Sequence, residues 1–371
     1  MENNIDEMLN KIDKQIEISE TQYEKAKSSY EAVGNYLINN MEYDAKVFAQ
    51  GSFKLGTVIK PISDRDEYDI DLVALIDHKF IDAKQLKNFV GDILKNSERY
   101  SEKIKEGKRC WTIDYAEDAS YHIDILPTMK SITYARDNKI IMTNKNLKEM
   151  NYEFMETNPE AYYNWFIKRM QEERKKLYEE YAINNKVNIE EIPEYKIKTK
   201  LQIAIEIVKR YRDIKFKDMI EIKPISIILT TIMAEVYTGN ESVYELIKKF
   251  SEEYMTHIEK DKNGNFIIRN PVNIEENFAD KWQIHPERKK AFFEFMRDLK
   301  KEIINNNILL YGNNIDIANE YKRLFGEEAV NRVYENMANE TKNEKNYVNE
   351  NGNVLKNKTN IMIRKHNFYG K

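Results

Sequence analysis

The chain contains 371 residues, of which only 11 are glycine and 7 are proline. This low content of glycine and proline excludes collagen-like and linker-like proteins and predicts long helices. Its 59 basic and 63 acidic residues give a net charge of −4, so no overall field favours nucleic acid or a membrane surface. The single cysteine, Cys110, excludes a disulfide framework and most structural zinc sites.

No segment of the sequence has the character of a signal peptide or a membrane span. The N-terminal residues MENNIDEML are acidic and lack an apolar core. The most apolar stretch, residues 225–237, is too short and too polar to cross a bilayer. We therefore expect a cytoplasmic, monomeric protein without a membrane partner and without strong nucleic-acid binding.

Apolar residues recur at helical spacing over residues 5–37, and Ser19 with Gln22 has the pattern of a capping box. This pattern predicts two helical segments that are separated near Ser19. Further along the chain the sequence changes to short β-rich runs, joined by a predicted helix over residues 83–94. These runs predict a mixed sheet over residues 46–145 and comprise residues 47–49, 57–59, 70–76, 110–113 and 121–126.

Helical periodicity returns after about residue 150. Within this half, Asn263-Gly264 lies between a charged and an apolar run and predicts one hairpin turn. Residues 337–360 are rich in Asn, Lys and Glu and predict a mobile tail. The predicted helices lie near residues 159–183, 198–214, 225–238, 241–256, 286–306 and 315–337.

The order of these elements predicts an α+β fold with four parts. A helical segment begins the chain, a sheet domain follows, and a larger helical domain precedes a polar tail. The predicted boundaries of these parts are residues 1–45, 46–150, 151–336 and 337–371.

Two of the few glycines, Gly51 and Gly56, have the spacing of a phosphate-binding P-loop. The P-loop interpretation fails because Thr57 stands where that motif needs lysine, and because Val58 and the residue after it favour a strand over a helix. What remains is a turn at Gly51-Ser52 whose backbone N–H groups and hydroxyl could hold phosphate oxygens.

Asp69 and Asp71 open the most hydrophobic predicted strand, where a period of two places both carboxylates on one face. Two like charges side by side are unfavourable unless a cation neutralises them, so the pair predicts a divalent metal. Asp64 and Asp66 have the same spacing, but their polar neighbours indicate a solvated loop. An EF-hand is excluded because Tyr68 occupies a ligand position.

A third carboxylate, Asp124, lies in the otherwise apolar segment Tyr121–Pro127, where an unpaired charge costs several kcal/mol. Alone, it could equally be an acid on an edge strand that faces water. Three strand-borne aspartates beside a phosphate-holding turn together predict a two-metal phosphoryl-transfer site. Carboxylate-only ligation favours two Mg²⁺ ions, for which Mn²⁺ could substitute.

A triphosphate needs a basic counterpart, and residues 196–217 hold eight Lys or Arg against two acids. Helical spacing places Lys209, Arg210 and Arg212 outside the apolar stripe of this segment. A solvated basic face is the alternative interpretation, but a position in the second domain, which could close over the sheet domain, favours a functional role for Lys209.

These motifs resemble the polymerase-β-like nucleotidyltransferase superfamily and, more narrowly, the bacterial cGAS/DncV-like nucleotidyltransferases (CD-NTases). The resemblance spans about residues 45–290 and depends on the joint order of its segments. The segments are Gln50–Thr57, Tyr68–Val73, His122–Pro127, Asn158–Phe166, Lys209–Asp213, Lys223–Ile228 and Glu276–Trp282.

The resemblance implies a bilobal enzyme with a central cleft, which joins NTPs (ATP, GTP or pyrimidine NTPs) into cyclic di- or trinucleotides. In the anti-phage systems called CBASS, such products activate a separate effector. The C-terminal residues His366–Lys371 resemble those that a ligase-like partner attaches to targets. The family resemblance also implies roles for single residues. These roles are donor-phosphate binding by Gln50, Gly51 and Ser52, metal binding by Asp69, Asp71 and Asp124, and triphosphate binding by Lys209 and Ser226.

Two other functions remain open from the sequence. One is a nucleotidyltransferase that modifies RNA or protein, and the other is a nucleotide-binding module without catalysis. The five histidines are scattered without ligand spacing, so none of them is assigned to a metal. The tyrosine pairs Tyr23/Tyr30 and Tyr162/Tyr163 are interpreted as packing residues.

Overall fold

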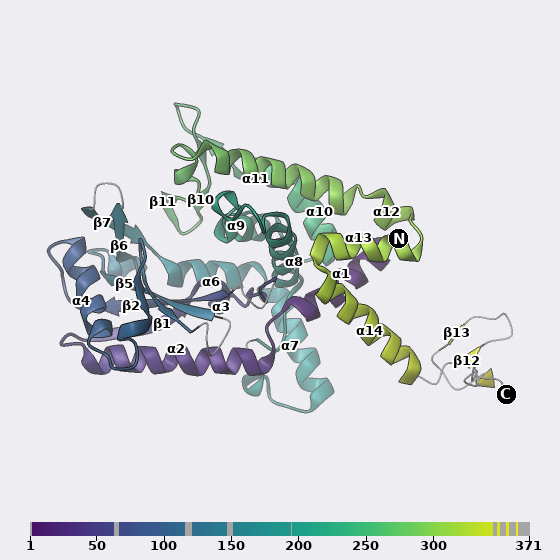
Figure 1. Ribbon diagram of the computed structural model, residues 1–371, viewed down its shortest axis with the longest axis horizontal. Helices are drawn as coiled ribbons and strands as arrows, with labels where there is room; N and C mark the ends of the chain where they lie inside the picture. The colour runs from purple at the N-terminus through teal and green to yellow at the C-terminus, as the bar shows by residue number, and fades with distance from the viewer. Residues whose placement is uncertain are drawn as a thin grey trace.

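The computed structural model describes residues 2–62, 67–115, 121–146, 151–193 and 195–343, together with three two-residue strands near the C-terminus. The chain begins with α1 (Glu2–Ile16) and α2 (Glu20–Asn40), and the predicted capping box of Ser19 and Gln22 begins the second helix. The break near Ser19 is therefore confirmed. The two helices separate, because α1 packs into the helical part of the protein and α2 runs along the sheet (Figure 1).

The sheet has seven strands, with the order β1-β2-β5-β4-β3 and with β6 and β7 attached through β5. Only β2 and β5 are parallel, and all other pairs in this sheet are antiparallel. The mixed sheet predicted from the sequence is thus confirmed. Its strands are β1 (Ala45–Gln50), β2 (Tyr68–Ile76), β3 (Ile104–Glu106), β4 (Trp111–Asp114), β5 (Tyr121–Lys130), β6 (Ile140–Asn146) and β7 (Asn151–Thr157).

The two faces of the sheet differ in what covers them. Alternate residues of β2 and β5, such as Ile70 and Ile123, pack with α2 and α4 (Ala83–Lys95) in one core. The opposite face carries a smaller apolar group that includes Val73, Leu75 and Leu126. This second face lies toward the helical part and holds the candidate site.

The predicted strand at residues 57–59 is wrong. Thr57 and Val58 are buried outside any strand, and Ile59 forms a single bridge to Glu17. Just before this segment, Gly51–Leu55 form the short helix α3 in place of the predicted turn. The chain after β1 therefore continues as a helical turn and then as irregular buried backbone.

The second half of the chain is helical, as predicted, with α8 at its centre in contact with α1, α9, α10 and α13. The predicted helix over residues 159–183 divides into two at Met170. The helices are α6 (Pro159–Arg169), α7 (Gln171–Asn185), α8 (Lys200–Lys215), α9 (Ser226–Val236), α10 (Val243–Glu253), α11 (Pro286–Leu299), α12 (Asn307–Tyr311), α13 (Asn314–Phe325) and α14 (Glu327–Asn343).

Two hairpins connect α10 to α11. The predicted turn at Asn263-Gly264 is confirmed, because it joins β8 (Glu259–Lys260) to β9 (Phe266–Ile267). The following pair, β10 (Arg269–Asn270) and β11 (Asn273–Asn277), lies beside β7 of the large sheet (Figure 1). This contact joins the helical part to the edge of the sheet.

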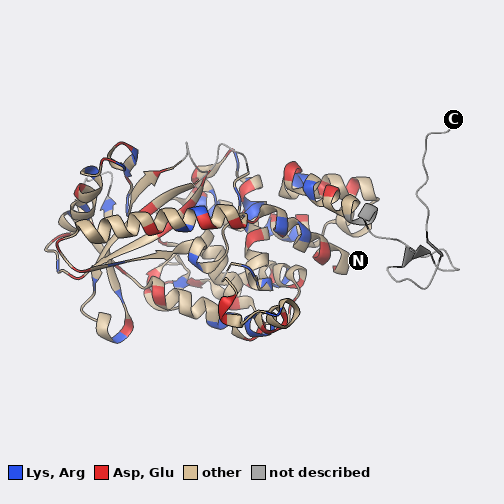
Figure 2. Ribbon diagram, turned by 90° about the horizontal axis from the view of Figure 1, so that it is seen from below, with Lys and Arg blue, Asp and Glu red and all other residues tan. Residues whose placement is uncertain are grey.

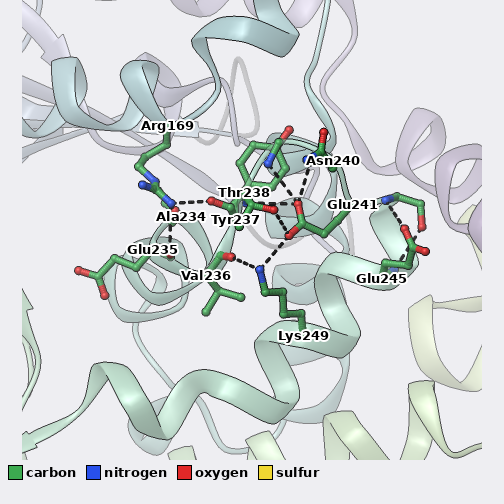
Figure 3. A network of polar contacts seen from close by, with 12 residues as sticks. Arg169, Ala234, Glu235, Val236, Tyr237, Thr238, Asn240, Glu241, Glu245 and Lys249 are labelled. Carbon is green, nitrogen blue, oxygen red and sulfur yellow. Dashed lines mark hydrogen bonds and ion pairs between the residues drawn. The ribbon is translucent and has the colours of Figure 1, made fainter.

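A polar network closes the C-terminal end of α9 and ties it to α6 and α10 (Figure 3). Arg169 of α6 donates to the carbonyl oxygens of Ala234, Glu235 and Tyr237, which the end of a helix leaves without partners. Lys249 of α10 donates to the carbonyl oxygen of Val236 at 2.9 Å. The network fixes α9, whose first residue is a predicted site residue.

The C-terminal region differs in part from the expectation. Helix α14 extends to Asn343, beyond the predicted end of the helical domain at residue 336. Of the three two-residue strands, β12 (Tyr347–Val348) pairs with both β13 (Val354–Leu355) and β14 (Ile361–Met362). The segment His366–Lys371, with its expected ligase-like partner, lies outside the described residues, as do Asp64 and Asp66.

No helix in the described ranges is both long and apolar enough to cross a membrane. Acidic and basic residues are interspersed along the described helices, and neither sign of charge dominates them (Figure 2).

Candidate active site

The three predicted aspartates meet on the sheet face that is turned toward the helical part. Asp71 of β2 lies in register with Asp124 of β5, and Gln50 of β1 lies in register with Asp71 on the other side. Asp69 is two residues earlier on β2 and shares the face of Asp71. The period of two that predicted this placement is therefore confirmed by the strand pairing.

Asp69, Asp71 and Asp124 are called the acidic row below. Gly51 brings the start of α3 directly against it. Its φ of +63° is a conformation that L-residues rarely adopt, and a Cβ atom there would lie 2.0 Å from Asp71 Oδ2. Gln50 is the N-cap residue of α3, and the first N–H groups of a helix have no partner within the helix. The predicted Gly-Ser turn is therefore a helix start that faces a carboxylate.

The carboxylates perturb one another. Burial raises the pKa of Asp71 to about 7, and the charges of Asp69 and Asp124 act in the same direction. Burial also raises the pKa of Asp69, but the hydrogen bond and charge of His122 outweigh it, so this pKa lies below its usual value. His122 therefore favours the charged form of Asp69, whereas burial and the neighbouring carboxylates disfavour the charged form of Asp71.

Two residues that sequence reasoning did not assign hold these carboxylates. His122 of β5 contacts Asp69 Oδ1 through Nε2 at 3.0 Å and Glu67 Oε2 through Nδ1 at 3.1 Å. The Asp69 hydrogen bond raises the pKa of His122 to about 9 against the effect of burial. Thr112 of β4 donates its hydroxyl to Asp124 Oδ1 at 2.5 Å. His122 precedes Asp124 by two residues on the same strand. This spacing places both side chains on one face of the sheet and could have identified His122 from the sequence.

We expect Thr112→Val to lower kcat about 10- to 100-fold, because the isosteric side chain no longer orients Asp124. Thr112→Ser, which keeps the hydroxyl, should restore most of the rate. The measurement is the initial rate of turnover together with the denaturation midpoint. An unchanged kcat in a folded Thr112→Val protein would show that this hydrogen bond does not position the carboxylate.

The chemistry of the donor set fits a divalent cation. Asp71 combines a raised pKa with close carboxylate neighbours, which is the condition that a bound cation relieves. Within the described ranges, no three His, Cys, Asp or Glu side chains are arranged as a complete metal site. In this structure Asp69 and Asp124 are instead hydrogen-bonded to His122 and Thr112.

The prediction that Lys209, Arg210 and Arg212 lie outside the buried face of α8 is wrong. All three are buried, with exposed fractions of 5–6%. Lys209 Nζ donates to the carbonyl oxygen of Thr57 at 2.6 Å, and burial lowers the pKa of this lysine to about 8. Arg210 donates to the carbonyl oxygen of Lys60 at 2.7 Å. Helix α8 is buried on all sides along this stretch, so Lys209 and Arg210 fix the segment after α3.

Lys209 nevertheless belongs to the site electrostatically, because its charge lowers the pKa of Asp69 and of Asp71. Ser226, the first residue of α9, is placed differently. Its Oγ accepts a hydrogen bond from Arg212 at 2.7 Å, and Arg212 also pairs with Asp213. Lys223 pairs with Asp213 at 3.2 Å and also lowers the pKa of Asp69. Lys223 therefore joins the basic side of the site.

A cleft of about 1330 Å³ opens beside the acidic row. Gln50, Gly51 and Asp71 line it from the sheet, and Tyr163 and Phe278 line it from the helical part. Asp69, Asp124, Ser52, Lys209 and Ser226 are not among its lining residues. The structure thus places Gln50, Gly51 and Asp71 at the wall of the cleft and the other predicted residues behind or beside it.

The tyrosines divide between packing and the cleft. Tyr23 stacks on Phe53 with ring centroids 4.6 Å apart, which agrees with the packing interpretation. Tyr162 is buried and its hydroxyl contacts that of Thr231 at 2.8 Å. Tyr30, Tyr162 and Tyr163 also line the cleft, so these three tyrosines face the cleft as well as packing against other side chains.

Comparison with known proteins supports this description. Residues 4–169 match the family "Second Messenger Oligonucleotide or Dinucleotide Synthetase domain". The chain is 31% identical over 306 residues to a c-di-GMP synthase of Roseivirga ehrenbergii, covering 80% of this chain and 78% of the relative. A cyclic dinucleotide synthase CdnG of Bradyrhizobium diazoefficiens is 23% identical over 75% of this chain and 70% of its own.

The fold is similar to that of the CD-NTase CdnG of B. diazoefficiens, solved in complex with GTP, with a TM-score of 0.71 at 19% identity. That likeness covers 90% of this chain and 99% of the other. The similarity to the Roseivirga enzyme extends over most of both chains, and the family match includes Asp69, Asp71 and Asp124. These two findings assign the chain to a family. The chain belongs to the CD-NTases, the cGAS/DncV-like nucleotidyltransferases with a polymerase-β-like fold.

Proposed function

We propose that this nucleotidyltransferase joins two nucleoside triphosphates into a cyclic dinucleotide and releases pyrophosphate at each bond formed. The observation that carries the proposal is the alignment of Gln50, Asp71 and Asp124 across three strands, with Gly51 against the Asp71 carboxylate. Because Gly51 has no side chain, its backbone N–H group can approach phosphate oxygens while the neighbouring Asp71 carboxylate faces the cations.

In this proposal the backbone N–H groups at Gly51 and Ser52, with Gln50, bind the donor phosphates. Asp69, Asp71 and Asp124 would hold two divalent cations, of which Mg²⁺ suits carboxylate ligands and substrate phosphates, and Mn²⁺ could replace it. Such cations stabilise the charge that develops on the α-phosphate and on the leaving group. Lys209 and Lys223 add positive charge from the helical part, and Arg212 positions Ser226 beside them.

The acceptor hydroxyl oxygen bonds to the donor α-phosphorus, and the bond between the α-phosphorus and the β-bridging oxygen breaks. Pyrophosphate leaves with that electron pair. Asp124, whose orientation is fixed by Thr112, takes the hydroxyl proton. A second transfer of the same kind closes the ring.

The proposed substrate is GTP. The Roseivirga relative, at 31% identity, is named for c-di-GMP synthesis, and the similar CdnG structure was solved with GTP. The proposed cellular role is to synthesise a second messenger in anti-phage (CBASS) signalling, as the family resemblance implies. The messenger would activate a separate effector. ATP and pyrimidine NTPs are the competing substrates.

The test is to incubate the full chain with GTP alone, and with each other NTP, in the presence of Mg²⁺, followed by mass spectrometry of phosphatase-resistant products. We expect cyclic di-GMP from GTP, no product in EDTA, and recovery when Mg²⁺ or Mn²⁺ is restored. Transfer of label from α-³²P-GTP to RNA or protein without a cyclic product would favour a modifying enzyme. Tight GTP binding without turnover would favour an inactive binding module.

A further inference from the structure

Helix α3, which carries Gly51 against Asp71, belongs to neither core alone. Phe53, in the middle of this five-residue helix, packs into the core of the sheet, and Leu55, at its end, packs into the core of the helical part. A helix of this length is not stable through its own hydrogen bonds, so outside contacts set its position. The position of Gly51 therefore depends on both parts of the protein.

One buried side chain of α8 holds the end of α3. Gln202 is 7% exposed, and its Nε2 donates to the carbonyl oxygen of Leu55 at 2.9 Å, across 147 positions of the sequence. The last carbonyl groups of a helix have no partner within the helix, so this bond satisfies a buried acceptor. It extends to α3 the hold that Lys209 and Arg210 of the same helix exert on the segment after it.

The amide of Gln202 is also fixed on its other side. Its Oε1 accepts from the backbone N–H of Thr199 at 3.0 Å and from the Thr199 hydroxyl at 3.1 Å, as part of the capping box that begins α8. Because Thr199 supplies only donors to this atom, the amide oxygen faces Thr199 and the amide nitrogen faces Leu55. One side chain thus caps α8 and ties that helix to α3.

This contact accounts for Gly56, the second glycine with the spacing of a P-loop. Gly56 ends α3 with a φ of +66°, and a Cβ atom there would lie 2.6 Å from Gln202 Nε2. A side chain at this position would therefore push the amide away from the carbonyl oxygen of Leu55. The N–H groups of Gly56 and Thr57 donate to carbonyl oxygens of α3 itself, at 3.4 and 2.9 Å. Gly56 serves the approach of Gln202 and not the binding of a phosphate.

We propose that Gln202 is a positioning residue, whose bond to Leu55 keeps Gly51 at the distance from Asp71 that nucleotidyl transfer requires. This inference rests on the proposed function. Gln202 is not among the residues that line the cleft, so its effect passes through α3.

The test is Gln202→Met in the full chain, because methionine keeps the length of the side chain and its helix propensity but has no amide. Turnover at saturating GTP should fall about tenfold, since a small displacement of the reacting groups is enough for such a loss. The KM for GTP should stay within about threefold of wild type, because the lost contribution is made in the transition state. Without substrate, hydrogen exchange at the Gly56 and Thr57 amides should become about tenfold faster or more.

Glu245→Met is the matched control. Glu245 completes another capping box in the helical part, where it accepts from the backbone N–H of Ser242 at 2.8 Å at the exposed start of α10. The control therefore removes the same half of a helix cap and introduces the same side chain. It should lower the denaturation midpoint but leave turnover, and exchange at Gly56, within about twofold of wild type.

Gly56→Ala tests the same bond from its other side. It should lower turnover by about as much as Gln202→Met, because the new methyl group displaces the amide. The double variant should be within about twofold of the slower single variant, since both substitutions remove one hydrogen bond. Gly264→Ala, where a Cβ atom would meet no other atom within 4 Å, measures the cost of a positive φ alone and should keep full turnover.

Unchanged exchange at Gly56 and Thr57 in Gln202→Met would overturn the inference, as would unchanged turnover or an equal loss of turnover in Glu245→Met. Losses that multiply in the double variant would overturn it too, because the two residues would then act separately. A raised KM at unchanged turnover would assign Gln202 to substrate binding instead. A wild-type enzyme that makes no cyclic product would refute the proposed function, and the exchange measurement would still decide whether Gln202 holds α3.

Discussion

Replacing Asp71 with asparagine is expected to lower turnover about 1,000-fold or more and, in the absence of metal, to make the protein more stable. The loss follows from the several kcal/mol of transition-state stabilisation that a cation held by this carboxylate supplies. The gain in stability follows from the structure, because Asp71 is half-buried beside the carboxylates of Asp69 and Asp124 and its pKa is raised to about 7. Function and stability therefore oppose each other at this position.

The pH dependence of this effect has a definite sign. An acid whose pKa is higher in the folded than in the unfolded state opposes folding once it is ionised. The Asp71 penalty is absent well below pH 4, grows as pH rises to about 7, and is constant above it. In EDTA, the Asp71→Asn protein should exceed wild type in unfolding free energy by an amount on the order of 2 kcal/mol at pH 8, and by almost nothing at pH 3.5.

Urea denaturation at the two pH values, with and without Mg²⁺, measures this difference. Mg²⁺ should stabilise the wild-type protein and leave the variant unchanged. An Asp71→Asn protein that is less stable than wild type at pH 8 in EDTA would contradict the account of the acidic row. Retained turnover would contradict the assignment of Asp71.

Replacing Gly51 with alanine is expected to reduce turnover about 100-fold and to destabilise the protein by about 1–2 kcal/mol. The stability loss comes from the positive φ of +63°, which is unfavourable for a residue with a Cβ. The loss of activity comes from contact, because the new Cβ would lie 2.0 Å from Asp71 Oδ2 and must displace the carboxylate. Steady-state kinetics and thermal denaturation measure the two effects.

Gly264 offers a matched control. It also has a positive φ, +81°, and lies in the β8–β9 hairpin, where a Cβ atom would meet no other atom within 4 Å and would lie outside the cleft. Gly264→Ala should therefore lose similar stability and keep full turnover. If both alanine variants lose turnover equally, backbone strain rather than the contact with Asp71 explains the effect at Gly51.

Local patterns predicted the fold wherever a local interaction decides it. The capping box at Ser19 marks a helix start because its partners are three residues apart. The strand predicted at residues 57–59 failed for the opposite reason. Val58 and Ile59 are buried without pairing into the sheet, and β propensity reports burial more than pairing. Helix α3, with five residues, is too short to show a periodicity.

The acidic row was predictable for a similar reason. A period of two fixes which side chains share a face, and two like charges side by side on that face call for a cation. The basic residues of α8 were misplaced because periodicity identifies only the apolar stripe, whereas α8 is surrounded by α1, α9, α10 and α13. The hydrogen bond of Lys209 to Thr57 joins residues that are 152 positions apart, and no local pattern records such a contact.

The most direct test of the central claim is a crystal structure of the full chain with Mn²⁺ and a non-hydrolysable GTP analogue, analysed by anomalous scattering. We expect two Mn²⁺ peaks within coordination distance of Asp69, Asp71 and Asp124, with Asp69 released from His122 and phosphate oxygens at the Gly51 and Ser52 N–H groups. Metal or triphosphate bound elsewhere in the cleft, with Asp69 still held by His122, would contradict it.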